Sequence, residues 1–341
     1  MKKVLAIVLV LALAFTLVAC GGEKKPEVEK KLIVYSSSVE EFHETIGPAF
    51  QEATGIEIEF VSAATGEGYA RMVAEKDNPQ ADILLIGAME VYKDTQYYEP
   101  YVSPNNDQLP EAFRTKDGFV NATNTSTPVI LYNTDLVNFE ITGYEDLLKP
   151  ELMGKIACGD SMKSASAYNH LENILLAMGK GDAYNPAAWD YVKALLKQLG
   201  GVIVNSSSAI HKGVVSGEYA VGLTWDTPCG TYIADGIKNV KVCLMKEGIV
   251  PKIAGTAIIK NCPHPENAKK FVDFMTSKEG QALLATIPGY SPVRDDIEMP
   301  STHVDLGINK GNIIKLDYAW SSANTDKIKD QYQKLYLEIF E

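Results

Sequence analysis

Two hydroxyl-rich segments are the places where this chain has the residue types to hold a polar molecule. The first segment follows a short apolar strand at residues 154–157 and places Ser164 and Ser166 at the start of a helix predicted over residues 167–177. Backbone N–H groups at a helix start lack partners and the helix dipole favours negative charge, so small side chains there admit an anion. Taken alone, the segment is better explained by a serine that caps the helix.

A second segment repeats this arrangement and favours the ligand interpretation. Ser207 and Ser208 follow the apolar run at residues 202–204 and open the helix that carries His211. Two such loops predict one polar ligand held between them. A partly buried histidine can donate to a phosphate oxygen with a charge that is tuned near neutral pH, whereas a packed or capped histidine is the alternative.

Alternating strands and helices must position these loops. The N-terminal third predicts strands over residues 32–36, 56–62 and 81–86, and helices over residues 39–53 and 66–76. This alternation indicates parallel βαβ units with right-handed crossovers, in which ligands lie beyond the carboxyl ends of strands. Those ends are small or hydroxylated here: Ser37, Ser38, Thr65 and Gly87. Any one is explained by a turn, but together they predict a cleft.

The second half of the chain adds crossings between two lobes. Thr127 lies in a hydroxyl cluster before a strand, where we predict the first crossing, and the chain should cross back between strands over residues 240–244 and 253–259. A further strand over residues 217–226 ends in Trp225 and Asp226. The indole could stack on a ring, and the carboxylate could accept from hydroxyls or an amine, or cap a helix.

The remaining elements are predicted from helical periodicity and breakers. The expected helices cover residues 142–148 (with Thr142 as N-cap), 186–199, 265–275, 278–287 and 326–340. Residues 94–113 are expected to form a surface loop with a short helix. Its tyrosines (Tyr97, Tyr98 and Tyr101) suggest either ferric iron or, more simply, aromatic packing.

The N-terminus has the parts of a bacterial export signal. Two lysines precede an apolar run over residues 4–18, and the Leu-Val-Ala-Cys sequence that ends at Cys20 resembles the lipobox of bacterial lipoproteins. We therefore expect a signal peptide at residues 1–19, lipidation of Cys20, and a flexible tether at residues 20–30 that anchors the protein to the membrane. A cleaved signal with a chance cysteine, or an uncleaved anchor, are the alternatives.

Charge and cysteine content exclude some classes of function. Loss of residues 1–19 leaves 30 basic and 44 acidic residues, a balance of −14, which disfavours nucleic-acid binding. The four further cysteines, Cys158, Cys229, Cys243 and Cys262, form no CxxC motif, so a zinc ribbon is unsupported and disulfides or free thiols both remain open.

The order of motifs resembles the solute-binding proteins of bacterial ABC transporters. The residues that carry the likeness lie at positions 32–36, 49–56, 81–84, 129–135, 214–222 and 265–280, of which the last segment is the most specific. The resemblance implies an α/β fold of the two-lobed type II periplasmic-binding class, with a mostly parallel sheet in each lobe and two crossing strands as hinge. It implies a first lobe at residues 31–124 and 254–300, and a second at residues 125–253 and 301–341.

The subgroup resembled contains ferric-iron, thiamine, 2-aminoethylphosphonate and hexose-phosphate binders. The positions that correspond to its ferric ligands hold Val39, Gly87, and Asp226 with Thr227, so the resemblance argues against iron. The anion-binding half matches at Ser164, Ser166 and Ser207. The full predicted ligand site is Ser37, Ser38, Thr65, Thr127, Ser164, Ser166, Ser207, Ser208, His211, Trp225 and Asp226, without a metal or cofactor.

The predicted function is capture of a small anionic solute and delivery to a permease and its ATPase. The organophosphates hexose phosphate and 2-aminoethylphosphonate are the leading ligands, and a monomer is expected. No GxSxG, HExxH or P-loop motif supports an exported hydrolase. Binding of ferric iron, thiamine or a polyamine, or a sensing role beside a membrane receptor, are the alternatives.

Overall fold

The computed structural model describes residues 30–204, 206–300, 306–308 and 311–340. The chain from Lys31 onward packs as one compact unit. The predicted signal peptide, Cys20 and most of the predicted tether lie outside the described residues.

The first sheet is built mainly from the N-terminal third of the chain. Its strands are β1 (Lys31–Ser36), β2 (Glu57–Ser62), β3 (Ile83–Gly87), β4 (Tyr98–Glu99), β5 (Asn121–Ser126), β11 (Lys252–Ile259) and β12 (Ser291–Pro292). They lie in the order β12-β5-β11-β3-β1-β2, with β4 paired to β11. The predicted βαβ units are present, because β1 pairs in parallel with both β2 and β3.

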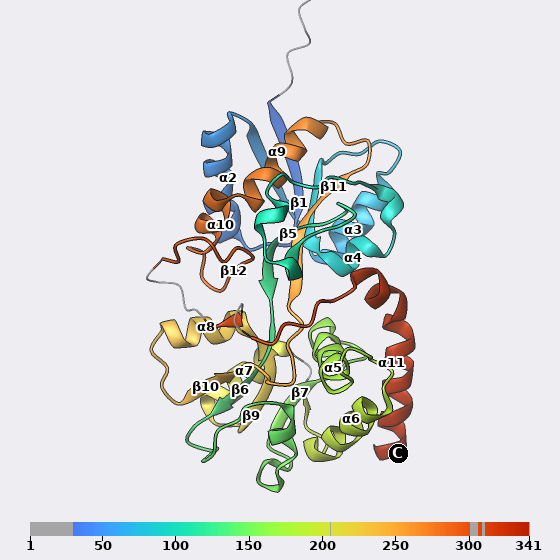
Figure 1. Ribbon diagram of the computed structural model, residues 1–341, viewed down its shortest axis with the longest axis vertical. Coiled ribbons are helices and arrows are strands. Elements are labelled where there is room, and N and C mark those ends of the chain that lie inside the picture. Colours follow the sequence, from blue (N-terminus) through green and yellow to red (C-terminus); the bar gives the residue numbers. More distant parts are fainter. Residues whose placement is uncertain (1–29, 205, 301–305, 309–310, 341) are drawn as a thin grey trace, which may run out of the picture. The chain divides into compact units, whose positions relative to one another are not determined.

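Helices cover both faces of this sheet (Figure 1). They are α2 (Glu40–Thr54), α3 (Thr65–Ala74), α4 (Ala88–Tyr92), α9 (Pro265–Thr276) and α10 (Lys278–Leu284), with short 3-10 turns η1 (Thr95–Tyr97), η2 (Asn106–Gln108) and η3 (Glu111–Phe113). β2 and β3 lie on opposite sides of β1 in the sheet, so the two connections run in opposite directions across it. Because both crossovers are right-handed, α2 and α3 lie on opposite faces of the sheet. As predicted, α2 buries its periodic apolar residues and ends at Gly55, which adopts φ 68°.

The second sheet carries the remaining elements. Its strands are β6 (Pro128–Asn133), β7 (Ile156–Gly159), β8 (Ile203–Val204), β9 (Val221–Trp225) and β10 (Val240–Cys243), in the order β10-β6-β9-β7-β8. Around it lie α5 (Ala165–Met178), α6 (Pro186–Leu199), α7 (Ser207–Ser216), α8 (Asp226–Ala234) and α11 (Tyr318–Phe340), with 3-10 turns η4 (Tyr144–Leu148) and η5 (Pro150–Leu152). The two sheets and their helices confirm the α/β class.

The chain passes between the sheets where the sequence predicts. Thr127 separates β5 of the first sheet from β6 of the second, and the chain returns between β10 and β11. The crossing strands pair antiparallel with their neighbours, so the sheets are more mixed than the predicted, mostly parallel arrangement. The long helix α11 then contacts α4, beside the first sheet, and α6, beside the second. The residue boundaries of the two lobes stay a prediction.

Three local predictions are wrong. Thr142 is not an N-cap, because the segment is the 3-10 turn η4, Gly143 precedes it, and Thr142 donates to the Asp146 carboxylate. The strand expected over residues 217–226 is shorter, since Asp226 already begins α8. The last helix begins at Tyr318 rather than residue 326.

Two open questions from the sequence are also resolved. All four described cysteines are free thiols and buried. The aromatic segment packs rather than facing a metal: Tyr98 is buried, and the Tyr101 hydroxyl donates to the Asp273 carboxylate at 2.9 Å.

Candidate functional site

A cavity of about 530 Å³ lies between α3 and α4 on one side and α5 and α11 on the other. Thr65 and Ala165, the first residues of α3 and α5, both line it. The residue before α3, Ala64, offers no side-chain cap to the first turn. Two helix N-termini from opposite sides of the crossing strands therefore meet one cavity, which gives it partial positive charge.

The serines at the start of α5 have two different roles. Ser164 is the N-cap, and its hydroxyl accepts from the Ala167 N–H at 3.2 Å, as the simpler interpretation expects. Ser166 lies inside the first turn and its hydroxyl accepts from the indole Nε1–H of Trp225. Ser166 and Trp225, predicted from separate motifs, are thus brought into contact.

The second hydroxyl segment is exposed at the start of α7. The hydroxyls of Ser206 and Ser208 lie 2.8 Å apart, and Ser207 and Ser208 face solvent. His211 is engaged within its own part of the fold, since its Nδ1 lies 2.7 Å from the Tyr232 hydroxyl. Burial, and then the neighbouring Lys212, lower the pKa of His211, so the ring favours its neutral form.

Asp226 joins the crossing strand to the start of α8. Its carboxylate accepts from the N–H of Thr127 at 3.0 Å and of Thr227 at 2.9 Å, and from the Ser291 hydroxyl at 3.3 Å. The residue is 1% exposed, and burial raises its pKa to about 6 against those hydrogen bonds. Its partners are therefore internal, whereas the buried hydroxyl of Thr127 has none among the described residues.

The loop after β1 presents hydroxyls at the carboxyl end of the first sheet. Ser37 is exposed and its hydroxyl donates to the Leu85 carbonyl at 3.5 Å, while the Ser38 N–H donates to the Ser36 hydroxyl. Tyr290 approaches the same loop, since its hydroxyl accepts from the Val39 N–H at 3.4 Å. Tyr290 was missed because it lies more than 250 residues away along the chain.

Sequence reasoning also missed a buried ion pair beside the cavity. Lys252, at the start of β11, lines the cavity, and its ammonium donates to the Glu172 carboxylate on α5. Glu172 is fully buried, and its second oxygen accepts from the Ser321 hydroxyl on α11. The available signal was a single acidic residue in a helix that is otherwise built from apolar and uncharged polar residues.

His170 is a second missed residue. Its Nε2–H donates to the Thr224 carbonyl at 2.6 Å, and its ring contacts Trp225. Full burial lowers the pKa of His170 to about 4, so the ring is neutral near pH 7. The neutral His170 ring therefore packs against the Trp225 indole.

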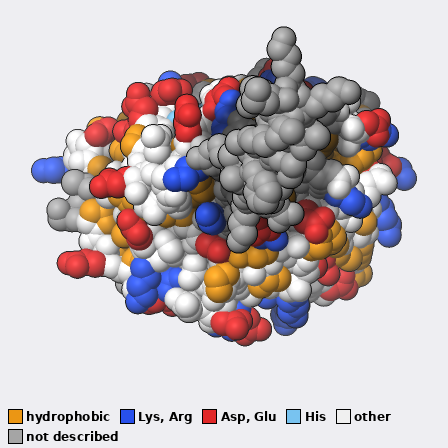
Figure 2. All heavy atoms as spheres, turned by 90° about the horizontal axis from the view of Figure 1, so that it is seen from above, with side chains coloured by type: hydrophobic (Ala, Val, Ile, Leu, Met, Phe, Trp, Pro, Cys, Tyr) orange, Lys and Arg blue, Asp and Glu red, His pale blue; other side chains and the backbone are white. Residues whose placement is uncertain are grey.

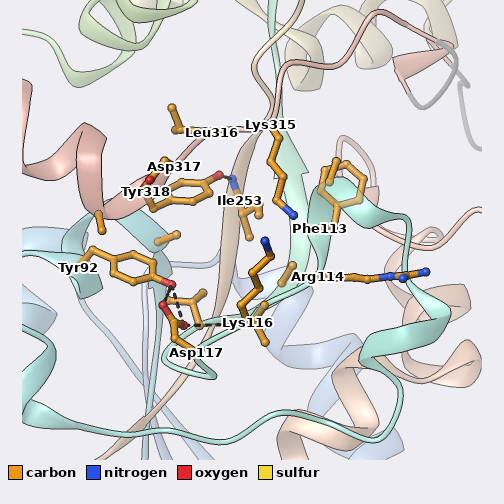
Figure 3. Close-up of a pocket in the computed structure, with 16 residues that line it drawn as sticks. Tyr92, Phe113, Arg114, Lys116, Asp117, Ile253, Lys315, Leu316, Asp317 and Tyr318 are labelled. Atoms are coloured by element: carbon orange, nitrogen blue, oxygen red, sulfur yellow. Dashed lines mark hydrogen bonds between the residues drawn. The ribbon is translucent and has the colours of Figure 1, made fainter. Parts of the chain in front are cut away.

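A second cavity of about 410 Å³ lies on the other side of Tyr318 (Figure 3). The side chains of Lys116 and Lys315 extend toward each other in this cavity. Asp117 also lines it, and the Tyr92 hydroxyl donates to the Asp117 carboxylate at 2.9 Å. The Tyr318 hydroxyl accepts from the Ile253 N–H at 2.7 Å, which ties α11 to the returning strand. The charged side chains of this cavity, Lys116, Asp117 and Lys315, are exposed.

The described residues on the face of the molecule drawn in Figure 2 show no concentration of one sign of charge. Figure 2 shows acidic and basic side chains interspersed on the face that it presents. Across the described ranges, no three His, Cys, Asp or Glu side chains gather closely enough to hold a metal ion. None of the helices in those ranges has the length and hydropathy of a membrane span.

Comparison with known families identifies the fold and its role. Residues 46–305 match the family model described as bacterial extracellular solute-binding protein. The chain belongs to this family. Its members bind a small solute outside the cytoplasm as components of ABC importers, and they are binding proteins rather than enzymes.

Individual relatives differ in what they bind. A probable ABC transporter periplasmic-binding protein of Sinorhizobium fredii is 28% identical, over 84% of this chain and 81% of its own. The iron uptake protein A1 of Synechocystis is 24% identical, over 86% and 84%. The periplasmic binding protein AfuA of Actinobacillus pleuropneumoniae, solved with fructose 6-phosphate, is 24% identical with a TM-score of 0.70, over 90% and 98%. The solute-binding protein therefore has the two-lobed type II fold.

Proposed function

We propose that this solute-binding protein captures a small organophosphate and delivers it to the permease of its importer. The observation that carries the proposal is the convergence of two helix N-termini, at Thr65 and Ala165, on one cavity. Backbone N–H groups at a helix start are well suited to phosphate oxygens. Hexose phosphates and 2-aminoethylphosphonate are the members of this ligand class that the resemblance to known families suggests.

Size and charge support the same conclusion. A cavity of about 530 Å³ suits a small metabolite. Its lining includes Lys93, Lys252 and Lys329 against a single acid that faces it, Asp326. The lining thus has more cations than acids, although the chain as a whole carries a charge of −12.

Ferric iron is the second candidate, because one relative is named an iron uptake protein. Ferric ion prefers phenolate and carboxylate oxygens. The only acid at the positions matched to iron ligands is Asp226, whose oxygens already accept from Thr127, Thr227 and Ser291. The residues present therefore favour an organic anion.

The first test is the identity of the molecule that stays with the purified protein. Mass spectrometry after denaturation should find a phosphorylated metabolite, and calorimetry should then show that fructose 6-phosphate or 2-aminoethylphosphonate binds. Copurified iron, with no heat from any phosphorylated probe, would overturn the proposal in favour of the iron alternative.

Ser166→Asp tests where the anion lies. A carboxylate in the first turn of α5 would occupy the region of positive potential, so the phosphorylated ligand should lose at least a hundredfold in affinity. Ser166→Asn is the neutral control of similar size and should lose far less. Equal affinities of the two variants in calorimetry would remove this helix start from the site.

We also propose that Cys20 carries a lipid anchor and that the mature protein is a monomer. Cys20→Ala should move the protein from the detergent phase to the aqueous phase in a phase-partition assay. If the protein instead senses ligand for a membrane receptor, crosslinking in cells should capture that receptor rather than a permease.

A further inference from the structure

The cavity has an inner end whose chemistry the serine loops do not explain. There Tyr168 of α5 and Lys252 of β11 line the cavity beside Ser322 and Thr325 of α11. These side chains are donors or hydroxyls. These four residues, which come from α5, β11 and α11, define what we call the inner end of the cavity.

Lys252 is buried with unused hydrogen-bonding capacity. The residue is 8% exposed, and in the described part of the chain its ammonium has one partner, Glu172. An ammonium group has three N–H donors, and leaving such donors unsatisfied in a buried place is costly. The two other donors of Lys252 have no partner among the described residues, although the residue lines the cavity.

Tyr168 presents a second unused donor. Its hydroxyl is buried and has no hydrogen-bond partner within the described ranges, although Glu172 and Thr325 are near. Burial, together with Glu172, raises the pKa of Tyr168, so the hydroxyl keeps its proton. A buried hydroxyl of this kind usually has a partner, and an acceptor on the ligand would supply it.

The charged residues around the inner end determine which kind of ligand group would bind there. Lys329 lies over the Tyr168 ring at 5.4 Å, and Lys93 and Asp326 line the same cavity. An ammonium on the ligand would be repelled by the lysines, which outnumber the one lining acid, and a neutral hydroxyl would use only part of their capacity. A carboxylate accepts from both Lys252 and Tyr168 and carries the complementary charge.

We propose that the inner end of the cavity is a carboxylate subsite, so that the preferred solute carries a phosphate or phosphonate at one end and a carboxylate at the other. This inference rests on the proposed function, which places the phosphate at the helix starts. Glu172 holds Lys252 in position when the cavity is empty, and the ammonium shares its donors with the carboxylate when the solute binds.

The test is calorimetry on the mature protein with two matched pairs of probes. The pair 3-phosphoglycerate and glycerol 3-phosphate differs by carboxylate against CH₂OH, and the pair phosphonoacetate and 2-aminoethylphosphonate differs by carboxylate against aminomethyl. In each pair the carboxylate probe should bind at least tenfold more tightly, since hydrogen bonds between charged groups are worth that factor or more.

Variants then assign the preference to named residues. Tyr168→Phe, which removes only an unpartnered hydroxyl, should reduce the ratio of the affinities within each pair about tenfold while the protein melts at or above the wild-type temperature. The double variant Lys252→Met with Glu172→Gln should abolish the preference without leaving a buried charge unpaired. If either variant unfolds, its circular-dichroism spectrum will show it and the other variant decides.

Each outcome has a separate meaning. Wild-type protein that binds no phosphorylated probe would overturn the proposed function and this inference with it. Wild-type protein that binds both members of each pair equally, or a Tyr168→Phe ratio equal to that of the wild type, would overturn the carboxylate subsite and leave the proposed function standing.

Discussion

At the scale of single residues, the buried carboxylate of Asp226 makes the stability of the crossing between the sheets depend on pH. Burial raises its pKa to about 6, from an ordinary value of 3.8, while Thr127 and Ser291 hold it in place. An acid whose pKa rises on folding binds more protons when folded. Its favourable contribution is therefore full below pH 3.8 and is lost as the pH rises through 6.

Replacing Asp226 by Asn should remove this pH dependence. The Asn oxygen still accepts from the Thr127 and Thr227 N–H groups. Between pH 4 and pH 7 the free energy of unfolding of the wild type should fall by about 2 to 3 kcal/mol relative to the variant. Urea unfolding at both pH values measures the difference, and a constant gap would mean that Asp226 titrates alike in both states.

Substitutions of Ser164 can test how charge affects ligand binding without changing the stability of the protein. Asp and Asn are both good N-caps, so either should replace the bond from the Ser164 hydroxyl to the Ala167 N–H without loss of stability. Only Asp adds a negative charge at the start of α5. Ser164→Asp should therefore bind the phosphorylated ligand at least tenfold more weakly than Ser164→Asn in calorimetry, at similar melting temperatures. Equal binding would place the anion elsewhere.

At the scale of elements, the close approach of β7 to α5 fixes where that helix starts. A Cβ on Gly159, the last residue of β7, would lie 2.9 Å from the Ala167 Cβ. Gly159→Ala should therefore displace the helix start, destabilise the protein by about 1 to 3 kcal/mol and weaken ligand binding.

Gly230 provides the matched control. It lies within α8, and a Cβ there would meet nothing within 4 Å. Gly230→Ala should stabilise the protein by about 0.5 to 1 kcal/mol, because the unfolded chain loses conformational freedom. Thermal and urea unfolding of both variants test the pair. A neutral Gly159→Ala would show that the strand and helix separate easily.

Elements with clear local signals were predictable from the sequence. The bounds of α6 match the prediction because Asn185 caps it, Pro186 fits its first turn and Gly200 ends it at φ 59°. The start of α11 was missed because residues 318–325 combine polar and aromatic residues without a clear apolar period. That first part is helical because it packs near the returning strand, where Tyr318 bonds to Ile253.

The candidate site likewise has a part with local sequence signals and a part without them. The helix start at Ala165, which lies between Ser164 and Ser166 and lines the cavity, could be predicted because it follows an apolar strand in the sequence. The pair of Lys252 and Glu172 could not, since these residues lie 80 positions apart and meet only through tertiary packing. Local patterns thus predict the strand ends and helix starts, whereas the inner wall of the cavity depends on how α11 and β11 pack against α5.

At the scale of the whole molecule, the cavity draws residues from both sides of the crossing strands. Thr65 begins α3 and Lys93 follows the end of α4, both beside the first sheet, while Ala165 begins α5 beside the second. A ligand that contacts both sets favours the conformation in which they are closest, by the difference in its affinity for the two conformations. Thr127 and Ile253 lie on the segments that must bend when the sheets move together.

Ligand binding should therefore make the protein both more compact and more stable. Small-angle X-ray scattering should show a smaller radius of gyration at saturating ligand than without it. At a ligand concentration one hundred times the dissociation constant, the folded state should gain about 2.7 kcal/mol. Ser166→Asp should gain at most about 0.4 kcal/mol at the same concentration, because a hundredfold loss of affinity leaves it no more than half saturated. A wild-type protein that gains stability while its scattering stays constant would be a rigid binder, and the crossing strands would then hold the cavity in its binding conformation before the ligand arrives.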